Sequence, residues 1–218
     1  MTVPRLKPNL DAVKMKSKDG YHHGDLRRTL LRAARRLLEK AGPEGLSLRA
    51  VATAAGVSHA APYHHFANRE ALVAAIATDA FDDLATALDG AASRHGPPTS
   101  KLVSLGAAYV RFATDHPARF ALMFGPVLAR KREHPALEAS SGRALGILHR
   151  ATEAVLGTSG RASADATLAS WSFIHGLSTL LVDGALEGHP LLSRSPEETA
   201  KALSEMLVVG MAQRARLR

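Results

Sequence analysis

Hydrophobic residues recur every three or four positions along almost the whole chain, which is the spacing of one face of an α-helix. The clearest early example is the stripe of Leu26, Leu30 and Leu37, which lies among arginines that fill the other faces of the same segment. Alanine is abundant, whereas the β-branched residues that favour strands are sparse. The pattern therefore predicts an all-α protein.

Four helices are expected in the first part of the chain, at residues 25–41, 48–55, 59–64 and 69–88. Ser47, Ser58 and Asn68 are placed to act as N-caps of the last three. Gly56 stands where a left-handed residue ends the second helix, and Gly90 is expected to end the fourth.

Beyond Gly96, Pro97 and Pro98 the basic residues thin out and the larger apolar side chains appear. Five more helices are expected, at residues 99–115, 117–124, 135–156, 163–186 and 196–216. Ser195 and Glu198 form a capping box at the start of the last one. We therefore divide the chain into a basic arm (1–20), a first domain (21–89) and a second domain (90–218).

Composition excludes several classes of protein. With 46% apolar and 22% charged residues the chain is typical of a globular protein, and its apolar runs are far shorter than the roughly 18 residues of a membrane span. It has no cysteine, so a disulfide framework and a thiolate metal site are excluded. The first 20 residues lack the apolar segment of a secretory signal, so we expect a cytoplasmic protein with no membrane partner.

Positive charge is concentrated at one end. Residues 1–70 carry thirteen Lys and Arg against six Asp and Glu, a net charge of +7, whereas residues 71–218 carry fifteen against fourteen, a net charge of +1. This asymmetry is typical of a polyanion-binding module joined to a neutral module, with nucleic acid as the first candidate. Charge alone fits a solvated basic face equally well.

Residues 47–66 combine a helix, a short turn with Gly56, and a second helix, which is the helix-turn-helix arrangement. Gly56 allows the sharp turn, and the small side chains of Ala60 and Ala61 permit close approach to a DNA groove. Ordinary helical hairpins share this bare pattern, so further motifs are needed.

Residues 21–85 resemble the DNA-binding domain of the TetR family of bacterial transcriptional regulators. The resemblance rests on an amphipathic first helix followed in order by GPEGLSLRAVATAAGVS, PYHHF and NREAL. It implies a DNA-facing set of Ser47, Arg49, Ser58, His59, Ala60, Tyr63, His64 and Arg69. Within this set Tyr63 and Arg69 would meet the phosphate backbone and residues 58–60 the base edges, while Phe66 belongs to the core.

Pro62 departs from the family pattern, which more often has leucine there. Counted from Ser58 as N-cap, it is the fourth helical position, so its missing amide is expected to cost one hydrogen bond of a short helix. Specificity would then depend on His59, His64 and DNA shape. The basic arm with Lys14, Lys16 and Lys18 is interpreted as a solubilising tail, with entry into a minor groove as the alternative.

The second domain carries the segment WSFIHGLSTLLVDGAL at residues 171–186, which resembles the TetR C-terminal type named for its Trp, His and Gly motif. The resemblance implies a small-molecule site and dimerisation through the last two helices. A hypothetical pocket is assigned to Phe112, Phe120, Met123, Phe124, Trp171 and His175. Ordinary core packing is the alternative for each of them.

An enzyme is a weaker interpretation, because the sequence has neither the His-Glu-x-x-His pattern nor paired Glu-x-x-His motifs. We expect no cofactor and no metal ion. The hypothesis is a homodimeric repressor that binds a pseudo-palindromic operator in double-stranded DNA and is released by a small apolar or amphipathic effector. The alternatives are an activator and an effector-independent, architectural DNA-binding protein.

Overall fold

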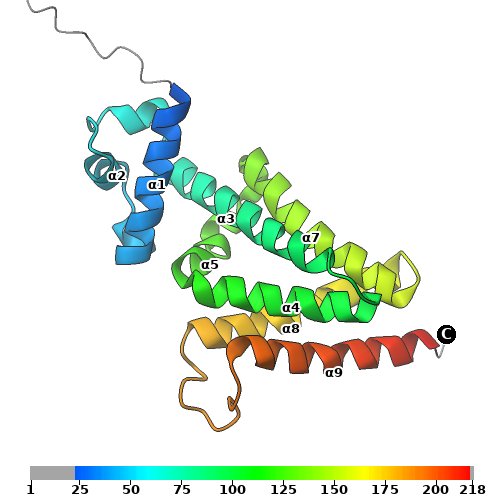
Figure 1. Ribbon diagram of the computed structural model, residues 1–218. Helices are drawn as coiled ribbons and strands as arrows, with labels where there is room; N and C mark the ends of the chain where they lie inside the picture. Colours follow the sequence, from blue (N-terminus) through cyan, green and yellow to red (C-terminus); the bar gives the residue numbers. More distant parts are fainter. Residues whose placement is uncertain (1–22, 217–218) are drawn as a thin grey trace, which may run out of the picture.

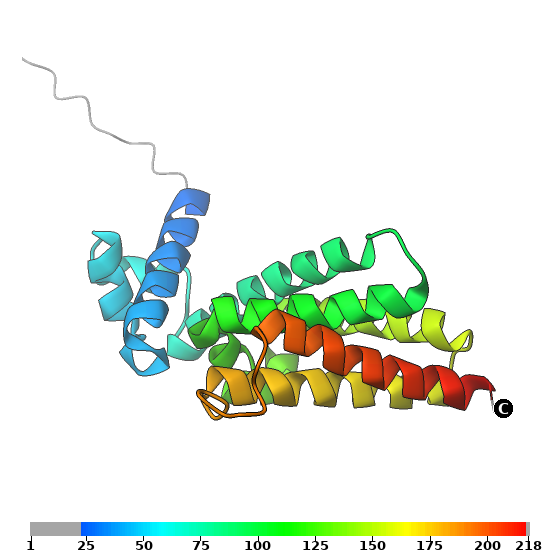
Figure 2. The same ribbon diagram turned by 60° about the horizontal axis from the view of Figure 1, so that its bottom comes forward.

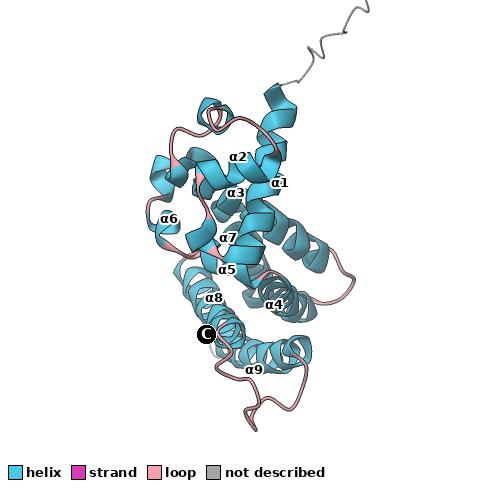
Figure 3. Ribbon diagram, turned by 90° about the vertical axis from the view of Figure 1, so that its left-hand side faces the viewer, coloured by secondary structure: helices cyan, strands magenta, loops and turns pink. Residues whose placement is uncertain are grey.

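A computed structural model describes residues 23–216, which form helices and short loops with no strand among them (Figure 3). This confirms the predicted all-α class. The basic arm with its three lysines lies outside the described residues.

The first helices gather at one end of the molecule (Figure 1). They are α1 (His23–Ala41), the 3₁₀ turn η1 (Pro43–Gly45), α2 (Leu48–Ala55) and the 3₁₀ turn η2 (Ala61–His64). Leu30 and Leu38 of α1 and Val51 of α2 are completely buried. They belong to the same hydrophobic core as Leu72 of the following helix. These apolar positions are the ones that the helical spacing predicts to lie inside.

Helix α3 (Arg69–Ala92) runs from this end into the rest of the molecule. The sequence predicts that Gly90 ends it, and this is wrong, because α3 continues through Gly90 to Ala92. A glycine ends a helix when it adopts a positive φ, and Gly90 is not among the glycines that do so. At the other end, the Asn68 side chain accepts a hydrogen bond of 2.8 Å from the Ala71 amide, as expected of an N-cap.

The remaining helices form a bundle around the second half of α3 (Figures 1 and 2). They are α4 (Pro98–Asp115), α5 (Pro117–Met123), α6 (Pro126–Ala129), η3 (Lys131–Glu133), α7 (Pro135–Leu156), α8 (Arg161–Val182) and α9 (Pro196–Arg216). Helix α3 packs on α4 and α7, and α4 in turn packs on α8 and α9. Figure 2 shows α8 and α9 side by side along one face.

Most boundaries agree with prediction, and two differences have simple causes. Helix α8 ends at Val182 rather than at residue 186, because Gly184 adopts a φ of 73°. The short elements α6 and η3 were not predicted, because one turn carries no periodic pattern. The capping box of α9 is confirmed: the Ser195 amide donates to Glu198 Oε2 at 3.0 Å, and the Glu198 amide donates to Ser195 Oγ at 3.3 Å. Within the described residues no helix has the length and apolar character needed to cross a membrane.

Candidate nucleic-acid interface and ligand cavity

The helix-turn-helix begins with a well-capped α2. Ser47 Oγ accepts a hydrogen bond of 3.1 Å from the Ala50 amide, and Gly56 ends the helix with a φ of 69°. Helix α2 buries Leu48 and Val51, which leaves Arg49 exposed on its outer side. The turn thus presents the start of α2 and the residues after Gly56 on one surface.

The predicted recognition helix at residues 59–64 is wrong in type and in start. The segment is the 3₁₀ turn η2, in which the Tyr63 amide donates to the Ala60 carbonyl at 3.1 Å. Buried Pro62 therefore stands in the first two positions of the turn rather than in the fourth of an α-helix. Because amides in a first turn have no intrahelical partner, the missing N–H of Pro62 does not cost the expected hydrogen bond.

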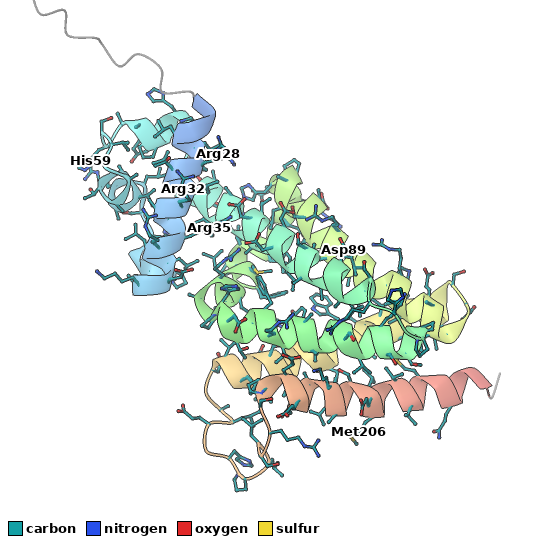
Figure 4. All side chains as sticks on the ribbon, viewed as in Figure 1. Arg28, Arg32, Arg35, His59, Asp89 and Met206 are labelled. Atoms are coloured by element: carbon teal, nitrogen blue, oxygen red, sulfur yellow. The ribbon has the colours of Figure 1, made fainter. Side chains whose placement is uncertain are left out.

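All eight of the predicted DNA-facing residues are exposed. They are Ser47, Arg49, Ser58, His59, Ala60, Tyr63, His64 and Arg69. Tyr63 is 54% exposed, which is unusual for an aromatic side chain, and Phe66 is buried as expected. Figure 4 shows His59 on the side of this unit that faces away from the bundle.

His59 has a neighbour that sequence reasoning missed. Its Nε2 atom lies 3.4 Å from Thr53 Oγ1, and the Thr53 hydroxyl also donates to the Arg49 carbonyl at 3.1 Å. Thr53 precedes the turn and carries no motif signal of its own. It contacts the His59 ring from the last turn of α2.

Arg69 has an intramolecular function in addition to the one that the family resemblance implies. Its Nε donates to the Leu46 carbonyl at 2.7 Å, and its Nη2 donates to the Pro43 carbonyl at 2.6 Å. The guanidinium therefore holds the start of α3 against the η1 turn and the chain leading into α2. Contact with a DNA phosphate stays a prediction for this residue.

The arginines of α1 add positive charge to the surface, and some of them also contact neighbouring elements. Arg28, Arg32 and Arg35 lie along the helix in Figure 4. Arg35 pairs with Asp79 of α3 at 2.6 Å, whereas the Arg27 guanidinium lies 5.5 Å from the centre of the Phe66 ring. Helix α1 is thus held to α3 by an ion pair and to Phe66, two residues beyond η2, by a contact between a guanidinium and an aromatic ring.

A cavity that is partly open to solvent lies in the bundle, between α3, α4, α7, α8 and α9. Its walls are mainly apolar, with Phe81 of α3, Leu105 of α4, Ala144 of α7 and Val208 of α9 as representatives. Apolar walls of this kind are typical of sites that bind the hydrocarbon part of a small molecule.

Only part of the predicted pocket lines this cavity. Phe124 and Trp171 do, whereas Phe112 and Met123 are buried elsewhere in the core. The Phe112 ring instead lies 5.7 Å from the guanidinium of Arg119. The prediction failed for these residues because helical spacing marks the buried face without showing which part of it is filled.

Phe120 and His175 form an aromatic cluster with Phe124, Trp171 and Tyr109 at the end of the cavity. The Phe124 and His175 ring centres are 4.3 Å apart, and His175 Nδ1 lies 2.9 Å from the Tyr109 hydroxyl. Burial lowers the pKa of His175 and raises that of Tyr109. Both groups are therefore neutral near pH 7 and form a hydrogen-bonded pair, in which Tyr109 lines the cavity while His175 and Phe120 lie behind the lining residues.

Sequence reasoning missed the charged and hydroxyl-bearing residues of the cavity wall, which are Tyr109, Lys131, Ser141, Ser170 and Ser204. Lys131 of η3 and Ser204 of α9 line the cavity, and Ser204 is 6% exposed. Neither belongs to a motif, and their proximity to the cavity depends on how distant helices pack. No sequence signal could have found them.

The segment at residues 130–134 joins the cavity region to the DNA-binding end. Arg130 Nη1 lies 2.7 Å from Glu70 Oε2, and His134 Nε2 lies 3.5 Å from Glu70 Oε1. Glu70 directly follows Arg69 in the first turn of α3. The hydrogen bond from Arg130 also lowers the pKa of Glu133.

Comparison with known proteins assigns the chain to a class. Residues 30–76 match the family model described as bacterial regulatory proteins, tetR family, and residues 102–207 match the model of the tetracyclin repressor-like C-terminal domain. The chain belongs to the TetR family and is a DNA-binding transcriptional regulator, not an enzyme. The Trp, His and Gly subtype stays a prediction.

Curated relatives agree with this assignment. The chain is 32% identical over 98 residues to the HTH-type transcriptional regulator Rv1816 of Mycobacterium tuberculosis, a match that covers 44% of this chain and 42% of the relative. It is 28% identical over 162 residues to the uncharacterized HTH-type transcriptional regulator Rv0681 of the same organism, covering 74% and 72% of the two chains. The first match therefore spans less than half the length of its relative.

Solved structures share the fold over most of their length. A protein of unknown function from Rhodococcus sp. RHA1 is 33% identical, with a TM-score of 0.73 over 90% of this chain and 100% of that one. The regulator FadR of Bacillus subtilis, solved with stearoyl-CoA, is 15% identical, with a TM-score of 0.66 over 84% and 98%. The latter likeness shows the fold alone.

Proposed function

We propose that this regulator is a homodimeric repressor whose affinity for a pseudo-palindromic operator falls when a small molecule occupies the cavity. The observation that carries the proposal is the course of α3. Its first turn holds the helix-turn-helix through Arg69, and Phe81, Leu84 and Leu88 farther along it line the cavity. A ligand that favours another position of α3 changes DNA affinity by the same coupling free energy with which DNA changes ligand affinity.

In this proposal residues 21–89 supply the DNA-binding domain and residues 90–218 the ligand-binding and dimerisation domain, with α3 reaching into both. Tyr63 and Arg69, together with the exposed Arg49, contact the phosphate backbone, while residues 58–60 approach base edges. The exposed surface of η2 and α2 and the basic side chains of α1 support this assignment.

Dimerisation is supported by an apolar face on the last two long helices. Leu168, Phe173 and Leu180 of α8 and Met206 and Val209 of α9 are all at least 37% exposed. Two adjacent helices with such a face pack well against the same face of a second copy, as in a four-helix bundle. A two-fold dimer would place two recognition turns roughly 34–36 Å apart, on successive turns of B-DNA.

The test is selection of bound duplexes from a random-sequence DNA pool by the purified protein. We expect recovery of a pseudo-palindrome, and mass measurement of the complex should give two chains per duplex. Titration with salt should show a steep loss of affinity for every duplex and a smaller effect on the preference among them. Recovery of duplexes without any common sequence would refute a specific operator and favour the architectural alternative.

The direction of regulation needs a separate measurement. A reporter promoter that carries the selected site should be less active when the protein is present. Higher activity would identify an activator, the second candidate function. Both results are compatible with the fold, because the sign depends on where the operator lies relative to the promoter.

A further inference from the structure

The charge of the cavity wall is unbalanced. Among the described residues that line it, Lys131 is the only one with an ionisable acidic or basic side chain other than Tyr109, whose hydroxyl is neutral. No Asp or Glu faces the hollow from any of its five helices. A cationic ligand would therefore meet one positive charge and no negative one.

Nearby acidic groups already have other partners. Glu133 pairs with Arg130 at 2.6 Å, and Glu70 pairs with the same guanidinium at 2.7 Å. Within residues 23–216 no described carboxylate lies within ion-pair distance of Lys131. The lysine charge at the cavity is thus left without a compensating anion from its own neighbourhood.

Ser204 also lines the cavity, and its hydroxyl has no hydrogen-bond partner among the described residues. Ser170 Oγ lies 3.8 Å from Met211 Sδ, and Ser141 Oγ donates to the Glu138 carbonyl at 3.1 Å, but no described group bonds the hydroxyl of Ser204. Ser204 packs against Gly106, where a Cβ would come within 2.4 Å of its Oγ. The glycine leaves room for this hydroxyl beside the cavity, where an oxygen atom of a ligand can bond it.

We propose that the cavity binds an amphipathic monocarboxylate, with its carboxylate paired to Lys131 and its hydrocarbon chain along the apolar walls. The inference rests on the ligand cavity of the proposed function and adds the chemical class. Phe81 and Leu88 are seven residues apart on α3, so the apolar wall extends about 10 Å along that helix. A hydrocarbon alone would leave the charge of Lys131 without a partner.

The protein carries its own reporter for this proposal. Trp171 is its single tryptophan, and it lines the cavity. Titration with decanoate at neutral pH, below its micelle concentration, should change the tryptophan fluorescence saturably. The matched probes are 1-decanol, which lacks the charge, and decylammonium, which reverses it. We expect decanoate to bind at least about tenfold more tightly than either.

Lys131 variants locate the source of this preference. Lys131→Met should bring the affinity for decanoate down to that for decanol and leave decanol unchanged, whereas Lys131→Arg should keep the preference. Lys101→Met is the matched control, because Lys101 lies on α4 outside the cavity. Circular dichroism of each variant confirms folding before titration.

The outcomes separate the two proposals. Equal binding of decanoate and decanol to the unchanged protein, or a preference that survives in Lys131→Met, would overturn the assignment of a carboxylate ligand and leave a ligand cavity in place. Failure of all three probes to bind would overturn the carboxylate proposal as well. Operator selection uses no ligand, so the proposed DNA-binding function is judged independently of both results.

Discussion

At the scale of single residues, His175 makes the stability of the bundle depend on pH. Its ring contacts Phe120, Phe124 and Trp171 and is hydrogen-bonded to Tyr109. Burial disfavours the charged imidazolium, so the pKa of His175 lies below its ordinary value of 6.5 in the folded protein. The unfolded chain therefore takes up this proton first as the pH falls.

His175 should make the fold less stable in mild acid. Because the unfolded state binds the proton more tightly, the contribution of His175 is fully present above pH 6.5 and is lost as the pH falls toward its folded pKa. The free energy of unfolding, from urea titrations between neutral pH and about pH 5, should fall less steeply in His175→Asn than in the unchanged protein. His95→Asn, in the exposed loop after α3, is the control and should leave the slope unchanged. Identical slopes for His175→Asn and the unchanged protein would contradict this role.

Contacts to bases and to phosphates should respond differently to mutation. His59→Ala should alter the sequence preference in a repeated duplex selection, because the proposed function places exposed His59 among the residues that approach base edges. Arg49→Ala should weaken binding to all duplexes alike and reduce the salt slope by about one. Fluorescence anisotropy with a panel of single-base variants of the operator measures both. An unchanged preference after His59→Ala would show that the histidine does not read sequence.

The individual residues show how far sequence reasoning extends. Capping groups such as Ser47, Asn68 and Glu198 were predictable, because each acts on a backbone amide three residues away or less. The exposed surface of the helix-turn-helix was also predictable from a dense local motif. Lys131 and Ser204 were not, since the cavity is assembled from helices far apart in the chain.

At the scale of elements, the 130–134 segment is the most specific link between the two halves. Lys131 lines the cavity, while Arg130 and His134 lie against Glu70 in the first turn of α3. The neighbouring Arg69 binds the carbonyls of Pro43 and Leu46. In the proposed function, a ligand that moves Lys131 would act on the base of the helix-turn-helix through this short series of contacts.

Glu70→Gln should reduce the communication between ligand and DNA. The variant loses the ion pair with Arg130 but keeps the shape of the side chain, so operator affinity without ligand should change little. The factor by which decanoate weakens operator binding should fall several-fold, as expected for a coupling change of about 0.5–2 kcal/mol. Anisotropy of a labelled operator with and without decanoate measures this factor. Glu138→Gln on the exposed side of α7 is the control, and an equal loss in both variants would refute a special role for Glu70.

Helix boundaries were predictable where proline or a cap defines them and less so elsewhere. Helix α7 begins at Pro135 and ends at Leu156, as predicted, because a proline starts it and Gly157 ends it with a φ of 64°. The recognition turn was misjudged because spacing cannot distinguish a short α-helix from a 3₁₀ turn. Pro62 lacks a backbone N–H and fits the first turn of either kind of helix. Its presence in the sequence therefore does not show which kind forms.

At the scale of the whole molecule, the exposed apolar face of α8 and α9 should control the oligomeric state. Figure 4 shows Met206 on the outer side of α9, and its side chain is 71% exposed. Met206→Glu would place a charge in the middle of a paired apolar face, where burying it without a partner is costly. We expect the molar mass in sedimentation to fall to one chain and the affinity for the full operator to fall by at least tenfold.

The same experiment has internal controls. Met206→Leu keeps the apolar character and should remain a dimer with full operator affinity. Binding of the Met206→Glu variant to a duplex with one half-site should match that of the unchanged protein, because the DNA-contacting surface lies at the other end of the molecule. A Met206→Glu protein that keeps the mass of two chains would exclude this face as the interface.

The unbroken course of α3 also constrains how such a regulator can be rebuilt by gene fusion. A fragment cut after Ala92 would expose Phe81, Leu84 and Leu88 to water, so a new sensor domain has to be joined within the helix. Each residue added or lost at that junction would turn the recognition unit by about 100° and shift it by about 1.5 Å. Chimeras should therefore work only at certain junction lengths, and helical phase would decide which exchanges of sensor domains remain functional.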